Sequence, residues 1–147
     1  MTPNDIVLCA PVRTPIGKFG GVLSPLSAAD LGAAVASACL TRAGLYPEAV
    51  DQALFGHGRQ AGGGPNTARQ ISFRAGLPVD RPAFTINQAC GSGLQAVLSA
   101  ARAIRLGEAE IVLAMICVCT RADVIVRNPD RVRHRRERGH PACRRIG

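Results

Sequence analysis

Residues 83–94 read Ala83-Phe84-Thr85-Ile86-Asn87-Gln88-Ala89-Cys90-Gly91-Ser92-Gly93-Leu94 and join two kinds of structure. The first four residues are apolar or β-branched, which is typical of a strand. The segment from Ser92 to Leu106 is amphipathic and alanine-rich, which predicts a helix. Glycines in the junction remove side-chain bulk and allow a tight backbone. The sequence therefore predicts a sharp strand-to-helix turn, with the thiol of Cys90 at the start of the helix.

The predicted helix has an apolar face and a polar face. We expect the apolar face to be buried, and it carries Leu94, Val97, Leu98, Ala101 and Ile104. The opposite face carries Gln95, Ser99, Arg102 and Arg105. Gly107 is suited to end this helix, and Glu110–Ala114 is an apolar run that predicts the next strand.

The position of Cys90 favours nucleophilic chemistry. A thiol at a helix N-terminus faces unpaired backbone N–H groups and the positive end of the helix dipole, and both favour the thiolate. The thiolate is the nucleophilic form of cysteine, and the same amides can hold a developing oxyanion. Cys90 is thus the candidate nucleophile of a covalent acyl-transfer site; the alternative is a small buried core thiol.

Strands and helices alternate along the rest of the chain. Apolar runs predict strands at Asp5–Val12 and Val50–Gly56. Ser27 with Asp30 three residues later forms a capping-box signal that opens a helix ending at Gly44. A second, short helix is expected from Asn66 or Thr67 to about Gly76. This order predicts an α/β fold with a parallel or mixed sheet covered by helices.

The basic character of the chain lies in its last part. The 147 residues carry a formal net charge of +8. Residues 1–120 contribute only +2 and residues 121–147 contribute +6. The stretch 131–138 is arginine-rich but has no interleaved aromatic residues, so we expect a solvated charge run and no specific nucleic-acid binding. We place the folded part at residues 1–114 and expect residues 115–147 to form an irregular, disordered basic tail.

Several other features are expected to be structural. The six cysteines are irregularly spaced, and we expect Cys9 and Cys39 to be buried free thiols. His57 is expected to be a loop residue and not a catalytic base. No membrane span or signal-peptide pattern is present, which predicts a cytoplasmic protein without membrane partners. No metal is expected, because the spacing of the metal-capable residues fits no zinc pattern: Cys117, Cys119, His134, His140 and Cys143.

Four segments resemble the thiolase family, the acetyl-CoA C-acyltransferases. Ile86–Val97 is similar to its acylation-site signature, and Pro11–Gly21 to its opening strand and loop. Gln60–Gln70 resembles its subunit-interface loop and helix, and Gly107–Ala114 resembles the strand after the nucleophile helix. The match covers residues 4–114. It implies an incomplete N-terminal thiolase domain.

The resemblance also implies a chemistry. Cys90 matches the nucleophile that takes an acyl group from acyl-CoA, for acetyl-CoA condensation or for thiolysis of 3-ketoacyl-CoA. CoA thioesters are then substrates, and no cofactor or metal is implied. The intact family is oligomeric, so a homo-oligomer is expected, with Asn66 and Arg69 in structural roles near a dimer contact. Gly91, Ser92 and Gly93 would shape the turn around the nucleophile.

Other family motifs have no counterpart in this chain. The CoA-binding loops, the Asn-Glu-Ala-Phe segment, the Gly-His-Pro histidine and the second cysteine lie beyond the matching part. Gly139-His140-Pro141 stands too early and has the wrong neighbours to supply that histidine. The alternative hypothesis is therefore a truncated or frameshifted inactive fragment that at most associates with an intact subunit. Reading the coding DNA in its other frames tests a frameshift near Ala114.

Overall fold

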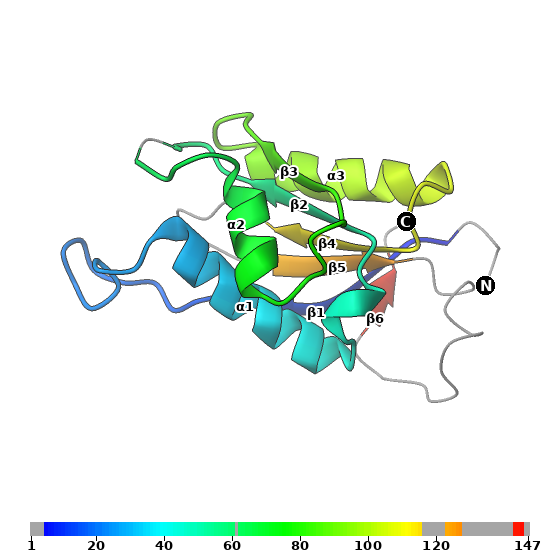
Figure 1. Ribbon diagram of the computed structural model, residues 1–147, viewed down its shortest axis with the longest axis horizontal. Helices are drawn as coiled ribbons and strands as arrows, with labels where there is room; N and C mark the ends of the chain where they lie inside the picture. Colours follow the sequence, from blue (N-terminus) through cyan, green and yellow to red (C-terminus); the bar gives the residue numbers. More distant parts are fainter. Residues whose placement is uncertain (1–4, 61, 116–122, 128–142, 146–147) are drawn as a thin grey trace.

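The computed structural model describes residues 5–60, 62–115, 123–127 and 143–145 as one sheet with helices on both faces (Figure 1). The α-helices are α1 (Ala28–Ala43), α2 (Thr67–Arg74) and α3 (Ser92–Arg105), and Pro47–Ala49 forms a short 3₁₀ turn. The strands are β1 (Val7–Val12), β2 (Gln52–Gly56), β3 (Ala83–Ile86), β4 (Ile111–Met115), β5 (Asp123–Arg127) and β6 (Cys143–Arg145). The α/β fold class expected from the sequence is confirmed.

The sheet is mixed, with strand order β3-β2-β4-β5-β1-β6. The strands β3, β2 and β4 run parallel to one another. The pairs β4–β5, β5–β1 and β1–β6 are antiparallel. β4 is therefore the strand at which the sheet changes from parallel to antiparallel pairing.

Two layers of apolar side chains hold the helices to the sheet. Alternate residues of β2 point to opposite faces, so Phe55 packs beneath α1 and α2 whereas Leu54 packs against α3. β4 divides its side chains in the same way, and all five of its residues are buried. Figure 1 shows α1 and α2 on one side of the sheet and α3 on the other. A strand covered on both faces explains why β4 reads as a continuous apolar run.

The predicted helix caps are present. The Ser27 side chain accepts a hydrogen bond from the Asp30 N–H at 3.1 Å, and the Asp30 carboxylate accepts one from the Ser27 N–H at 2.9 Å. Gly44 closes α1 in the left-handed conformation with φ of 63°. Asn66 caps α2. These local signals fix the helix ends that the sequence predicts.

The buried face of α3 differs from the one expected. Leu94 and Leu98 are 63% and 44% exposed, so the prediction that they lie in the core is wrong. The buried residues are mostly small: Ser92, Gly93, Ala96, Val97, Ala100, Ala103 and Ile104. Small side chains let the helix axis approach the sheet closely, and the larger leucines of the same apolar half are left outside that contact.

The last part of the chain also differs from expectation. Residues 115–147 were expected to be irregular, yet β4 extends to Met115 and two later segments form β5 and β6. The run Val124-Ile125-Val126 is β-branched, and such residues favour strands even between charged neighbours. The remaining residues of this tail lie outside the described ones.

Candidate active site

The candidate nucleophile lies on the turn between β3 and α3. Cys90 is a free, exposed cysteine two residues before the first residue of α3. Gly91 is the N-cap and provides no side-chain hydrogen bond to the helix. The thiol therefore lies beside the start of the helix, as the sequence predicts, and it is accessible to a substrate. The alternative of a buried core thiol is wrong.

The turn is stabilised by hydrogen bonds within it. Ala89, immediately before the cysteine, has φ of 47°, in the left-handed region that residues other than glycine rarely adopt. The Asn87 Oδ1 atom accepts a hydrogen bond from the Ala89 N–H at 3.0 Å. Ser92 is completely buried, and its hydroxyl donates to the Ala89 carbonyl at 2.6 Å. It also accepts from the Gln88 N–H at 2.9 Å.

Two glycines of the β2 end and its following loop lie against this turn. A Cβ atom on Gly56 would stand 2.5 Å from the backbone N of Gly93 and 2.5 Å from the carbonyl carbon of Ser92. A Cβ on Gly58 would stand 2.9 Å from the carbonyl oxygen of Ala89. The backbone of β2 thus touches the backbone of the first turn of α3. This contact is not predicted above, although a glycine that ends an apolar strand is a signal of close backbone approach.

His57 follows β2 and is buried, with 3% of its surface exposed. Its Nδ1 atom is hydrogen-bonded to the Thr67 Oγ1 atom at 2.9 Å. Burial lowers the pKa of His57, and a hydrogen bond to the backbone of Arg59 partly opposes that shift. Among the described residues, no hydrogen bond joins the His57 ring to Cys90. His57 therefore ties the end of β2 to α2 and is not placed as a base for the thiol.

We expect His57 to make the chain less stable as the pH falls below its ordinary pKa of 6.5. Above that pH the imidazole is neutral in both states. Below it, the unfolded chain binds a proton that the folded chain resists, so the free energy of unfolding decreases. Urea unfolding between about pH 7 and pH 5 measures this dependence. A His57→Gln variant should show a smaller slope over that range, and equal slopes in the two proteins would contradict the prediction.

Asn66 and Arg69 have the structural roles expected of them. Asn66 Oδ1 accepts from the Arg69 N–H at 3.2 Å and from the Thr85 hydroxyl at 2.8 Å. The Arg69 guanidinium donates to the carbonyls of Val79 and Arg81 at 3.2 Å and 2.7 Å. These contacts fasten α2 to β3 and to the loop that precedes it.

The remaining cysteines and histidines do not assemble around Cys90. Cys39 is a buried free thiol that donates to the Ala10 carbonyl at 3.1 Å, as expected. Cys9 is buried but disulfide-bonded, so the expectation of a free thiol is wrong for it. The side chains of the metal-capable residues after position 115 lie outside the described ones. Within the described residues, no three His, Cys, Asp or Glu side chains are grouped to hold a metal ion.

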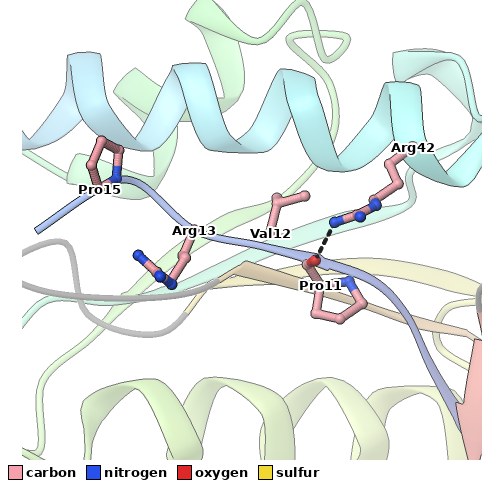
Figure 2. A pocket seen from close by; sticks show the side chains of 5 residues that line it. All are labelled: Pro11, Val12, Arg13, Pro15 and Arg42. Atoms are coloured by element: carbon pink, nitrogen blue, oxygen red, sulfur yellow. Dashed lines mark hydrogen bonds between the residues drawn. The ribbon is translucent and has the colours of Figure 1, made fainter.

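The chain also has an open groove between the end of β1 and α1, in the antiparallel half of the sheet. Its volume is about 630 Å³, and its lining comprises Pro11, Val12, Arg13, Pro15 and Arg42. The guanidinium of Arg42 on α1 donates to the Pro11 carbonyl at 2.9 Å (Figure 2). The Arg13 side chain points away from Arg42. No residue of the Cys90 turn lines this groove.

In the described part of the chain, no helix has the length and hydropathy needed to cross a membrane.

Comparison with protein families gives a match to the thiolase N-terminal domain over residues 6–117. An acetyl-CoA acetyltransferase of Cupriavidus necator is 52% identical over 111 residues, which are 76% of this chain and 28% of that relative. An acetyl-CoA acetyltransferase of Syntrophomonas wolfei is 47% identical over the same shares. The chain therefore spans about 28% of the length of the curated relatives that it matches.

Solved structures agree with this match. The Acat5 thiolase of Ascaris suum in complex with coenzyme A has a TM-score of 0.73 at 38% identity, covering 75% of this chain and 29% of that one. The human mitochondrial 3-ketoacyl-CoA thiolase in complex with CoA has a TM-score of 0.72 at 37% identity, covering 75% and 28%. The matching segment includes β3, the Cys90 turn and α3.

Proposed function

The chain belongs to the thiolase family, and from this membership we propose that Cys90 accepts an acyl group from an acyl-CoA thioester. The observation that carries the proposal is the exposed free thiol on a tight turn at the start of α3. That turn lies inside the segment that matches the thiolase N-terminal domain. The intact enzyme uses such an acyl-cysteine for acetyl-CoA condensation or for thiolysis of 3-ketoacyl-CoA.

The proposed step exchanges one thioester for another. The Cys90 sulfur attacks the carbonyl carbon of the acyl-CoA, and a new S–C bond forms as the bond from that carbon to the CoA sulfur breaks. The proton of the Cys90 thiol ends on the CoA thiol that leaves. The step requires no oxidant, metal or further cofactor, because the acyl-CoA and the acyl-cysteine are both thioesters of similar energy. The N–H groups of Gly91 and Ser92 at the start of α3 already donate to the carbonyls of Gln88 and Ala89, at 2.9 Å and 3.2 Å. The proposed step therefore does not rely on these two groups to hold the oxyanion.

The substrate proposal is supported by the relatives. Coenzyme A is bound in the Ascaris suum and human thiolase structures. We propose CoA thioesters as the substrates of Cys90 on this basis. Self-association and a cytoplasmic location stay predictions. For self-association, β3 lies at the edge of the sheet and is fastened by Asn66 and Thr85, so it offers a fixed strand for pairing.

The alternative is an inactive fragment. It is favoured by one observation, namely that the chain spans about 28% of the length of its relatives. We therefore expect little or no turnover of acetoacetyl-CoA by this chain. This expectation holds even if Cys90 accepts an acyl group. The test that distinguishes acyl transfer at Cys90 from an inactive fragment is therefore formation of the acyl-cysteine, and not turnover.

The experiment incubates the full 147-residue chain with acetyl-CoA and locates the acetyl group by mass spectrometry of peptides. We expect one acetyl group on Cys90, removable by hydroxylamine as a thioester is, and none in the Cys90→Ala variant. Cys39 serves as an internal control, because its buried thiol is expected to stay unmodified.

Uncatalysed exchange between thiols and thioesters must be separated from this reaction. The same chain unfolded in urea supplies the matched rate for the Cys90 peptide. Acetylation of Cys90 that is no faster in the folded chain than in the unfolded chain would reject the acyl-transfer proposal. The chain would then be interpreted as an inactive fragment.

A further inference from the structure

The residue before the nucleophile has a backbone conformation that its side chain disfavours. Ala89 has φ of 47°, whereas the turn places no glycine at this position. An L-residue with a Cβ is less stable there than in the ordinary regions. Local hydrogen bonds or packing must therefore hold Ala89 in place.

Both polar groups of the Ala89 backbone have partners. Its N–H donates to Asn87 Oδ1 at 3.0 Å. Its carbonyl accepts from the Ser92 hydroxyl at 2.6 Å and from the Ser92 N–H at 3.2 Å. The same carbonyl lies close to Gly58, where a Cβ atom would stand 2.9 Å from it. The shortest of these hydrogen bonds comes from a side chain, that of Ser92.

Ser92 is suited to hold the turn and not to take part in proton transfer. It is fully buried at the start of α3, and its hydroxyl spans the turn by accepting from Gln88 and donating to Ala89. Its only proton is thus committed to a carbonyl that cannot pass it on. The hydroxyl joins the residues before Cys90 to the helix after it, and so fixes the path of the chain through the nucleophile.

We propose that Ser92 is a positioning residue for Cys90, whose buried hydroxyl holds Ala89 in the left-handed conformation and thereby sets the position of the thiol at the start of α3. This inference rests on the proposed function, because a position matters only if Cys90 reacts. Loss of the Ser92 hydroxyl frees Ala89 to return to an ordinary φ, and Cys90 moves with it. Small displacements of a nucleophile reduce its rate strongly.

The test uses Ser92→Ala in two backgrounds of the full chain. In the natural background we expect acetyl transfer from acetyl-CoA to Cys90 to slow by about tenfold. In an Ala89→Gly background the same substitution should slow transfer by less than about twofold relative to Ala89→Gly alone, because glycine adopts positive φ without a penalty. Equal losses in the two backgrounds, or no loss in either, would overturn the proposal.

The matched control is Ser72→Ala. Ser72 is also a buried helix serine, 1% exposed, and its hydroxyl donates to the Ala68 carbonyl at 2.7 Å, but it lies in α2. Its removal should lower stability without slowing transfer to Cys90. If Ser92→Ala alone does not fold, recovery of the fold in the Ala89→Gly background supports the proposal, and persistent unfolding opposes it.

A second measurement separates this proposal from the proposed function. The Cα and Cβ chemical shifts of Ala89 report the sign of its φ in the absence of any substrate. We expect the natural chain to show the positive-φ signature and Ser92→Ala to lose it. If the natural chain transfers no acetyl group, the acyl-transfer proposal fails, and these shifts still decide whether Ser92 holds the turn. An unchanged signature in Ser92→Ala would overturn the positioning role.

Discussion

Replacing Gly56 by alanine is expected to lower the free energy of unfolding by about 3 kcal/mol or more. The new Cβ would lie 2.5 Å from two backbone atoms of the first turn of α3, those of Ser92 and Gly93. Backbone atoms within a helix cannot move aside as a flexible side chain can, so α3 or β2 must shift as a whole. Such a shift also displaces the Cys90 turn. Urea unfolding measures the loss of stability, and the rate of Cys90 alkylation reports the displacement.

Gly32 provides the matched control within the same chain. A Cβ on Gly32 would also stand 2.5 Å from its nearest neighbour, but that neighbour is the terminal Cδ1 atom of Ile71. A side-chain end can rotate away, and alanine in α1 gains about 1 kcal/mol of helix propensity over glycine. We therefore expect Gly32→Ala to cost far less than Gly56→Ala. Comparable losses in the two variants would show that the backbone contact at Gly56 is not rigid.

Phe55→Ala is the second large effect, with an expected loss of about 3–5 kcal/mol. Phe55 is fully buried in the apolar layer beneath α1 and α2, and among the described residues it is the largest completely buried side chain. Its removal leaves a cavity that β2, fixed between β3 and β4, cannot close. Urea unfolding followed by far-UV circular dichroism gives the change, provided that the transition stays two-state.

Phe84 on β3 is the control for this substitution. It lies on the neighbouring parallel strand, opposite Leu54 in the register, and is 51% exposed. The same Phe→Ala change there removes about half as much buried surface and leaves no enclosed cavity, so we expect a loss of about 1–2 kcal/mol, below that at Phe55. A loss at Phe84 as large as that at Phe55 would mean that β3 is covered in solution, for example by a second copy of the chain.

Most elements of the fold could be predicted because their signals are local. The capping box of Ser27 and Asp30 and the glycine at 44 mark the two ends of α1 within a few residues of chain. The apolar run of β4 is visible because both faces of that strand are buried. Cys90 could be placed on its turn for the same reason, since the strand before it and the helix after it have distinct patterns.

The parts that could not be predicted depend on contacts between distant residues. Hydrophobicity alone predicts that Leu94 and Leu98 are buried, but the residues of α3 that pack against the sheet are mostly small. The contact of Gly56 with Ser92 and Gly93 is between segments that no periodicity relates. The strand β5 was not predicted, because its β-branched residues lie next to an arginine-rich segment.

The order of the strands has a consequence for how this chain is synthesised. β1 leaves the ribosome before the other described strands, yet its described partners in the sheet are β5 and β6, which follow all of them in the sequence. Translation at about 5–20 residues per second therefore leaves an apolar strand without a partner for several seconds. During that interval β1 is exposed to chaperones and to other nascent chains, while α1 can already form from its own caps. The described sheet is complete only when β1 inserts between β5 and β6.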